Sequence, residues 1–457
     1  MKTRRRPRHA NVRASASNSL SSPRAPLVDA RERPATSAIY SGIVPLSIVA
    51  LLPYPSLAPY LVSRFLSSMA LTLARATIAW QVYEISGSAF HLGLIGLAQF
   101  VPAFLVSLLA GAVADSRERR KVAMVAQTIP ALGTGVLAWF TLQGAIGLPL
   151  IYLMVILIAG ASAFEVPARH SMLPQLVPRD IFPRAVTVNG AVHMFALMTG
   201  PVIVGFLIDA QGVWAPYALH AALLVASLAV LSRVRPTYDS GERTAISVKA
   251  IREGLSFVRR ERVVLGSMIL DMFAVLFGGA VALLPVYATD ILGVGARGYG
   301  ILASALEIGA AIMALVLILA PPFKRTGRAL LVAIGVFGAA TIVFGLSRSF
   351  ALSMVAYMAA GMADFVSVVT RNTAIQLSTP DHLRGRVSSV QMVFIGASNQ
   401  LGLAESGFVA ALTSPTFAVV SGGIGALIVT GLIALRNPAL RRYEAVPDSG
   451  AGGATAA

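Results

Sequence analysis

The sequence predicts an all-α membrane protein in which twelve transmembrane helices form two pseudo-symmetric six-helix bundles. Its 457 residues are 56% hydrophobic, with a mean hydropathy of +0.75, and this composition does not fit a soluble domain of that length. The apolar residues gather in twelve stretches, each close to the roughly 20 residues that a helix needs to cross a bilayer. Most basic residues lie in every second gap between these stretches, as expected of a polytopic membrane protein.

A long polar segment near the middle of the chain separates two sets of six predicted helices. The first set covers residues 60–83, 90–114, 120–141, 147–167, 185–208 and 213–232. The second set covers residues 263–289, 298–320, 328–346, 350–370, 387–410 and 416–435. The predicted organisation is an N-terminal tail (1–56), a first bundle (57–233), a linker (234–262), a second bundle (263–436) and a C-terminal tail (437–457).

The distribution of charge predicts the orientation of the helices. Of the 37 lysines and arginines, all but Arg64, Arg75, Arg297 and Arg348 lie in the tails, the linker or the remaining even-numbered loops. Basic residues beside membrane helices stay in the cytoplasm, so we expect both termini inside and the protein in the cytoplasmic (inner) membrane. The net charge of +17 comes from these flanking segments and suits an anionic inner leaflet, so no nucleic-acid partner is expected.

Two segments outside the predicted helices have distinct compositions. The tail over residues 1–56 is rich in Ser, Arg and Pro, and we expect it to be disordered and cytoplasmic. A translation start further downstream is an alternative, whereas three prolines between residues 45 and 55 disfavour a thirteenth membrane helix. In the linker, Ile251, Leu255 and Val258 share one helical face, which predicts an amphipathic helix on the membrane surface.

Composition also excludes several classes of function. The chain has no cysteine and its six histidines show no metal-ligand spacing, so neither a disulfide nor a metal site is expected. It contains no Gly-x-x-x-x-Gly-Lys-Ser/Thr phosphate loop, so we do not expect ATP hydrolysis. No cluster of His, Asp and Ser residues indicates a catalytic centre, so we expect neither enzymatic activity nor a cofactor.

The loop between the second and third predicted helices carries the most specific motif. Gly111 is followed four residues later by Asp115 and then by a basic cluster that includes Arg119 and Arg120. This loop resembles the signature loop of the major facilitator superfamily, although Ser116 replaces the usual arginine. The resemblance implies that Asp115 faces the start of the eleventh helix and that the basic cluster bridges the two halves on the cytoplasmic side.

The fifth predicted helix carries a second motif, formed by Gly200, Pro201 and Gly205. Glycines permit close helix contact, and a proline frees one backbone carbonyl and bends the helix. The segment resembles the glycine–proline motif of antiporters of the same superfamily, although Ala196 and Val204 replace two of its glycines. The motif favours export, with simple helix packing as the alternative interpretation.

Further segments resemble the drug:proton antiporter branch of this superfamily that includes the enterobactin exporter and macrolide efflux proteins. They cover residues 164–169, 173–178, 283–287, 364–371, 379–387, 398–402 and 405–407. Together the matches extend over residues 60–436, and they indicate a branch without naming a substrate.

The two halves of the chain repeat each other weakly. At an offset of 202 residues, Arg169, Pro178, Arg184, Gly200 and Gly205 correspond to Arg371, Pro380, Arg386, Gly402 and Gly407. At an offset of 207, Gly93 corresponds to Gly300 and Arg64 to Asp271. Duplicated six-helix halves place a binding site near the membrane midplane between them.

Ionisable residues inside membrane helices are costly, so they indicate functional or paired positions. The candidates for substrate binding or proton coupling are Arg64, Arg75, Asp271, Glu307, Asp364 and Glu405. Because helices 1, 4, 7 and 10 line the central cavity in this superfamily, we expect Arg75, Asp271 and Asp364 there and Glu307 beside it. We also expect Arg64 and Asp271, at matching depths, to form a cytoplasmic gate pair, with static ion pairing for folding as an equal alternative.

These observations predict a secondary active exporter that works by alternating access and is driven by the proton gradient. Its expected partners are a small amphipathic substrate (a drug, siderophore or secondary metabolite), protons and the lipid bilayer, and it is expected to act as a monomer. One alternative is an importer of a polar metabolite such as a sugar or organic anion. An alternative outside substrate transport is a membrane sensor or a lipid scramblase.

Overall fold

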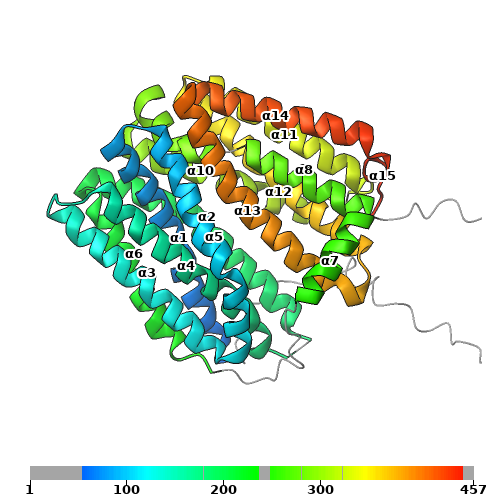
Figure 1. The fold of residues 1–457 in the computed structure, drawn as a ribbon, viewed down its shortest axis with the longest axis horizontal. Helices are drawn as coiled ribbons and strands as arrows, with labels where there is room; N and C mark the ends of the chain where they lie inside the picture. The colour runs from blue at the N-terminus through cyan, green and yellow to red at the C-terminus, as the bar shows by residue number, and fades with distance from the viewer. Residues whose placement is uncertain (1–53, 179, 236–247, 279, 322, 446–457) are drawn as a thin grey trace, which may run out of the picture. The chain divides into compact units, whose positions relative to one another are not determined.

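Figure 1 shows a computed structural model of the chain, which describes residues 54–178, 180–235, 248–278, 280–321 and 323–445. Within these ranges, the side chains of residues 107–112, 114–116 and 248–251 also lie outside the described part. The described segments are helices joined by short loops, and no β-strand occurs among them. The predicted N-terminal tail up to residue 53 falls outside the described residues.

Six long helices make up the first half of the chain. They are α1 (Leu57–Ser86), α2 (Ala89–Ser116), α3 (Arg119–Leu142), α4 (Leu148–Met172), α5 (Phe182–Gln211) and α6 (Trp214–Leu231), with a short 3-10 turn η3 (Leu173–Gln175) after α4. Each long helix overlaps one predicted stretch. Local signals set several ends: Gly87 adopts a left-handed φ of 59° after α1, and the Oγ of Ser88 accepts a hydrogen bond from the amide of Phe90 at the start of α2.

The described part of the second half contains five long helices, one helix interrupted near its middle, and several short helices. They are α7 (Val248–Arg260), α8 (Arg262–Phe277), η4 (Ala280–Leu283), α9 (Leu284–Val286), η5 (Tyr287–Ile291), α10 (Gly295–Leu319), α11 (Thr326–Leu346), α12 (Phe350–Ser378), η6 (Asp381–Leu383), α13 (Arg384–Leu412), α14 (Pro415–Arg436) and α15 (Pro438–Arg441). The order and spacing of the long helices repeat those of the first half.

Eleven helical segments in the described part are long and apolar enough to cross a membrane. The predicted span that does not meet this criterion lies in α13. This helix has 29 residues, so its length of about 43 Å exceeds the thickness of the hydrocarbon core. It is less apolar because it carries Arg384, Arg386 and Glu405 together with several amides and hydroxyls. The count of twelve spans and the cytoplasmic placement of both termini stay predictions.

The predicted helix over residues 263–289 is wrong in one respect, because it is not continuous. Helix α8 ends at Phe277, and a 3-10 turn, one α-helical turn and the π-helical turn η5 follow. Gly278 lies at the break, where a methyl group would come within 2.5 Å of the ring of Phe337. Pro285 also lacks the amide that a regular helix would use. An apolar run therefore marked the span but not the change in backbone hydrogen bonding within it.

Two helix pairs join the halves: α5 packs along α10, and α2 packs along α13 (Figure 1). In the first pair, a methyl group on Gly205 would lie 2.9 Å from the Cα of Gly300. In the second pair, a methyl group on Gly93 would lie 3.1 Å from the Cα of Gly407. These four glycines are the ones that the repeat offsets relate to each other, so the pseudo-symmetry produces two equivalent close contacts between the halves.

The linker contains the amphipathic helix α7, which packs against α13 and α8. Val258 is buried, and Leu255 packs beside it against the core of the second half. Glu253 forms an ion pair with Arg386 near the start of α13. Helix α7 therefore lies against one end of the second half.

Candidate functional site

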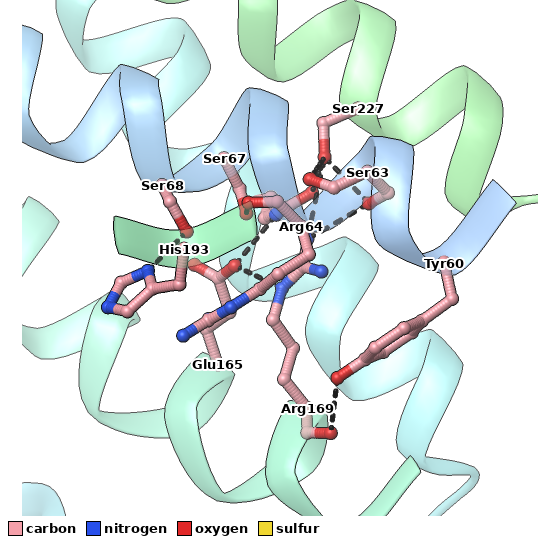
Figure 2. A network of polar contacts seen from close by, with 10 residues as sticks. Tyr60, Ser63, Arg64, Ser67, Ser68, Glu165, Arg169, His193 and Ser227 are labelled. Carbon is pink, nitrogen blue, oxygen red and sulfur yellow. Dashed lines mark hydrogen bonds and ion pairs between the residues drawn. The ribbon is translucent and has the colours of Figure 1, made fainter. Parts of the chain in front are cut away.

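Buried polar side chains from α1, α3 and α4 form a network in the first half (Figure 2). Its centre is Arg169 of α4, whose side chain is only 1% exposed. The Nε of Arg169 donates to the Oε1 of Glu165 at 2.6 Å, and its Nη2 donates to the Oγ of Ser63 at 3.1 Å. The Nε2 of Gln127 donates to the same carboxylate oxygen at 2.7 Å. One buried ion pair thus links three helices at the end predicted to face the cytoplasm.

Arg64 of α1 lies beside this network without joining it. Figure 2 shows its guanidinium extending next to Glu165 and Arg169. The buried Nε of Arg64 has no hydrogen-bond partner among the described residues. On the same stretch of α1, the Oγ of Ser68 lies 2.9 Å from the Nδ1 of His193 of α5. Among the described residues, the Nε of Arg64 is therefore a buried donor without an acceptor in this conformation.

The second half contains the counterpart of this network. Arg371 of α12 corresponds to Arg169 by the repeat, and it forms an ion pair with Asp271 of α8. The side chains of Arg371 and Asp271 are 4% and 9% exposed. The predicted gate pair between Arg64 and Asp271 is therefore wrong for this conformation. Matching depth in symmetry-related helices did not bring the two side chains together, because each has a nearer charged neighbour within its own half.

A second group of charges lies where the halves face each other. Arg75 comes from α1, Glu307 from α10 and Asp364 from α12. Glu307 interacts electrostatically with both Arg75 and Asp364. The side chain of Arg75 is exposed, whereas those of Glu307 and Asp364 are partly buried. We call Arg75, Glu307 and Asp364 the central charge cluster.

Aromatic side chains border the central charge cluster. The rings of Trp80 and Tyr299 have centroids 5.2 Å apart, and the Oη of Tyr299 donates to the carbonyl of Ala76 at 2.9 Å. Tyr357 is buried and interacts electrostatically with both carboxylates of the cluster. All three rings are buried, so in this conformation they pack around the central charge cluster.

The remaining sequence candidates lie apart from this cluster. Glu405 of α13 is partly buried and accepts a hydrogen bond from its neighbour Ser406 at 3.1 Å. Gly200 faces α1, where a methyl group would approach the carbonyl of Met69 to 3.2 Å, and Pro201 follows it inside α5. Gly205 makes the contact with α10 described above. The helix 5 motif therefore serves close packing in this conformation.

The signature loop is described only in part. Gly111 and Asp115 belong to α2, but their side chains lie outside the described residues. The Nη1 of Arg119 donates to the carbonyl of Ser171 at 2.7 Å, and that of Arg120 donates to the carbonyl of Val234 at 2.9 Å. These contacts stay within the first half, whereas the resemblance implied a bridge between the halves. They satisfy free carbonyls near the ends of α4 and α6.

Glu118 orders the same loop through its carboxylate. Its oxygens contact the Nζ of Lys121 at 2.8 Å and Nη2 of Arg120 at 3.1 Å. The hydrogen bond from Lys121 and the two positive charges lower the pKa of Glu118 below its usual range. Glu118 is therefore ionised at neutral pH.

Two polar contacts join the halves at the end opposite to the Arg169 network. The Oη of Tyr83 in α1 donates to Asp290 in η5. The Nε of Arg297 in α10 lies 2.7 Å from the Oδ2 of Asp209 in α5. We call these two contacts the outer latch, because the charge pattern predicts that this end faces away from the cytoplasm.

Removing the outer latch should favour separation of the halves at that end. The chain has no cysteine, so a single cysteine placed at the buried Ala296 reports access to this interface. In Asp290→Asn combined with Arg297→Gln, we expect labelling by a membrane-impermeant thiol reagent to be about tenfold faster, since 1.4 kcal/mol changes an equilibrium tenfold. Arg348→Gln is the matched control, because Arg348 bonds to Thr416 within its own half. Equal labelling in all backgrounds would contradict the latch.

In the sequence, Arg169 stood out only through the repeat and Glu165 only within the matched segment 164–169, and Arg371 was missed as the partner of Asp271. The available signal was the repeat offset, which matched Arg169 with Arg371. Two arginines at equivalent positions inside apolar helices both require a buried acceptor. By that requirement, Arg371 was an alternative partner for Asp271, in competition with Arg64.

Comparison with known proteins identifies the family. Residues 57–450 match the profile of a family described as transmembrane secretion effector. The chain belongs to this family of major facilitator transporters. It is 28% identical over 388 residues to the multidrug efflux pump Tap of Mycobacterium tuberculosis, covering 81% of this chain and 90% of that protein. It is 26% identical over 407 residues to the enterobactin exporter EntS of Escherichia coli, covering 88% and 96%.

Solved structures share the fold at low sequence identity. The nucleoside transporter NupG has a TM-score of 0.67 and 13% identity, covering 85% of this chain and 100% of that one. A bacterial homologue of the human lysosomal transporter Spinster, in an inward-facing and occupied conformation, has a TM-score of 0.67 and 13% identity, covering 86% and 99%. The chain is therefore a multi-pass membrane transporter of the major facilitator type with efflux proteins among its relatives.

Proposed function

We propose that this transporter exports a small amphipathic compound from the cytoplasm in exchange for protons, by alternating access across the inner membrane. The observation that carries the proposal is the central charge cluster, in which two carboxylates and one arginine from both halves interact within the membrane helices, with the arginine exposed. The named relatives, a multidrug efflux pump and an enterobactin exporter, support export and a small-molecule substrate.

The arrangement of contacts between the halves supports an inward-facing state. The glycine contacts lie near the start of α2 and of α10 and near the end of α5 and of α13, and the outer latch lies at the same ends. By the predicted orientation, these ends are extracytoplasmic. In alternating access, separation of these contacts would open the central charge cluster to the outside.

The central charge cluster has the composition that proton exchange requires. Arg75 balances one of the two carboxylates, Glu307 or Asp364, so the second becomes an unpaired negative charge unless it holds a proton. A substrate with a positive or hydrogen-bonding group would displace that proton on binding, and proton return would displace the substrate. This competition couples the two movements without any covalent step.

Neutralising Glu307 and Asp364 tests this proposal. In proteoliposomes with an imposed pH gradient, we expect Glu307→Gln and Asp364→Asn each to reduce uphill transport to the level of empty vesicles. Downhill exchange and substrate binding should persist, because an amide mimics the protonated carboxyl. The substrate panel comprises cationic antibiotics, dyes and catecholate siderophores, each measured with and without a proton uncoupler.

Glu405→Gln is the matched control, since it removes a carboxylate from a membrane helix outside the central charge cluster. It should retain uphill transport. Uncoupler-insensitive uphill transport in the wild type would refute proton coupling. Accumulation of a polar metabolite in the direction of the cytoplasm, with no efflux across the panel, would replace the exporter by an importer.

A further inference from the structure

The last described segment of the chain is fixed against the second bundle. Helix α15 follows α14 directly, and its Leu440 is fully buried against α8 and α11. The side-chain amide of Asn437 donates to the carbonyl of Arg262 at 2.8 Å. The amide of Gly327 donates to the carbonyl of Tyr443 at 3.1 Å. A methyl group on Gly327 would overlap the carbonyl of Leu440, so this close docking depends on glycine.

This docking brings basic side chains from two distant parts of the sequence around one cavity. The cavity has a volume of about 610 Å³ and is lined by Arg325, Arg328, Arg441, Arg442 and Glu444. Its size falls in the range of roughly 300–1,000 Å³ typical of ligand pockets. We call it the arginine pocket.

Among the residues that the structure describes, the charge of the arginine pocket is not neutralised from within. Four guanidinium groups face one carboxylate, and the Nε of Arg325 is 3.7 Å from the Oε1 of Glu444, a distance too long for a direct hydrogen bond. The side chains of Arg325 and Glu444 are 66% and 43% exposed, so their attraction is weak. The excess positive charge requires either bulk counterions or a bound anion.

Guanidinium groups select a particular kind of anion. Their planar forks donate paired hydrogen bonds to phosphate oxygens, and clustered arginines bind phosphate more strongly than isolated ones. The pocket also lies beside the end of α14, where Leu435 is 74% exposed and apolar. A basic pocket next to an apolar helix end on the cytoplasmic side is a typical receptor for anionic lipid headgroups.

We propose that the arginine pocket binds a phosphate group, carried either by an anionic phospholipid or by a soluble phosphate compound. The bound phosphate would bridge the start of α11 to the segment after α14, and so stabilise the docking of α15. None of the pocket residues belongs to the central charge cluster, so the proposal is independent of the transported substrate.

The test measures binding to the purified full chain. In one arm, phosphatidylglycerol or phosphatidylcholine is added to the delipidated protein in detergent. Native mass spectrometry then measures how much of each lipid binds, and thermal unfolding measures how much each lipid stabilises the protein. In the other arm, inorganic phosphate is added without lipid, with chloride at equal ionic strength as reference. Because one basic residue contributes about fivefold to the affinity for anionic headgroups, Arg328→Gln combined with Arg441→Gln should weaken binding roughly thirtyfold.

Two further variants keep the result interpretable. Arg233→Gln combined with Arg436→Gln removes the same charge from exposed positions that do not line the pocket, and it should change affinity less than twofold by the loss of long-range charge alone. Glu444→Gln removes the one acidic group among the described residues that line the pocket and should raise affinity about fivefold. Misfolding cannot mimic this gain.

Preference for phosphatidylglycerol that the pocket variant abolishes would assign the site to lipid. Saturable stabilisation by inorganic phosphate, lost in the same variant, would assign it to a soluble phosphate compound. Equal weakening in the pocket and control variants, or no gain from Glu444→Gln, would overturn the proposal.

Discussion

Replacing Arg371 by alanine is expected to destabilise the second bundle by about 3–5 kcal/mol, the cost of leaving one partner of a buried ion pair uncompensated. Arg371 and Asp271 are both nearly inaccessible to solvent, and their pairing connects α12 to α8. Without the guanidinium, the carboxylate of Asp271 stays in an apolar environment with no opposite charge. Thermal unfolding in detergent and the yield of monodisperse protein measure the effect.

A double neutralisation separates the loss of the pair from the burial of a single charge. Asp271→Asn combined with Arg371→Gln should recover most of the stability, since two hydrogen-bonding amides carry no charge. Arg386→Gln provides the control, because the side chains of Arg386 and its partner Glu253 are 37% and 39% exposed, and this ion pair should contribute about 0–1 kcal/mol.

The same pair gives a direct test of the gate predicted from sequence. Exchanging Arg64 and Asp271 should not restore a folded protein, because Arg371 would then face a second arginine. Rescue by that exchange would show instead that Arg64 and Asp271 meet in another state of the transport cycle.

Enlarging the glycines at the contacts between the halves is expected to abolish transport while leaving each bundle folded. A methyl group on Gly205 would lie 2.6 Å from the carbonyl of Ala296, and one on Gly300 would lie 2.5 Å from the carbonyl of Pro201. These neighbours are backbone atoms and cannot rotate away, so α5 and α10 must separate. Overpacking of this kind costs about 1–3 kcal/mol, and here the cost falls on the conformation with the outer ends closed.

Transport activity is expected to decrease from the wild type to Gly205→Ala, and Gly205→Leu should have no measurable activity. Disulfide formation between cysteines at positions 209 and 297 measures the fraction of protein with its outer ends closed. In the wild type, Asp209 and Arg297 form an ion pair across this interface. The cross-link should form readily in the otherwise cysteine-free chain and fail in Gly205→Leu.

Gly190 is the matched control on the same helix, since no atom lies within 4 Å of a methyl group placed on it. Gly190→Ala should retain both the cross-link and transport. Full transport by Gly205→Leu would contradict a role for this contact in the cycle.

Much of the architecture was predictable because membrane insertion depends on composition. Apolar stretches of about 20 residues, with most basic residues in every second loop, predicted most long helices of the described part to within about three residues at each end. Helices α4 and α12 extend further past their predicted ends, to Met172 and Ser378. Weak internal repeats also matched Gly93 with Gly300 and Gly205 with Gly407 before their contacts were known. The interruption at Gly278 was missed, because hydropathy reports burial in lipid and not the pattern of backbone hydrogen bonds.

Sequence by itself determined which residues carry charge inside the membrane and how the two halves correspond. Only the tertiary structure decided how those charges pair. Asp271 forms an ion pair with Arg371 rather than with Arg64, Glu307 lies within electrostatic range of Arg75 and Asp364, and arginines from α11 and the C-terminal segment surround one pocket. The physical reason is that the cost of a charge in lipid depends on its own helix, whereas its partner depends on the rotation and separation of neighbouring helices. Those are set by glycine contacts and side-chain packing between segments far apart in the chain.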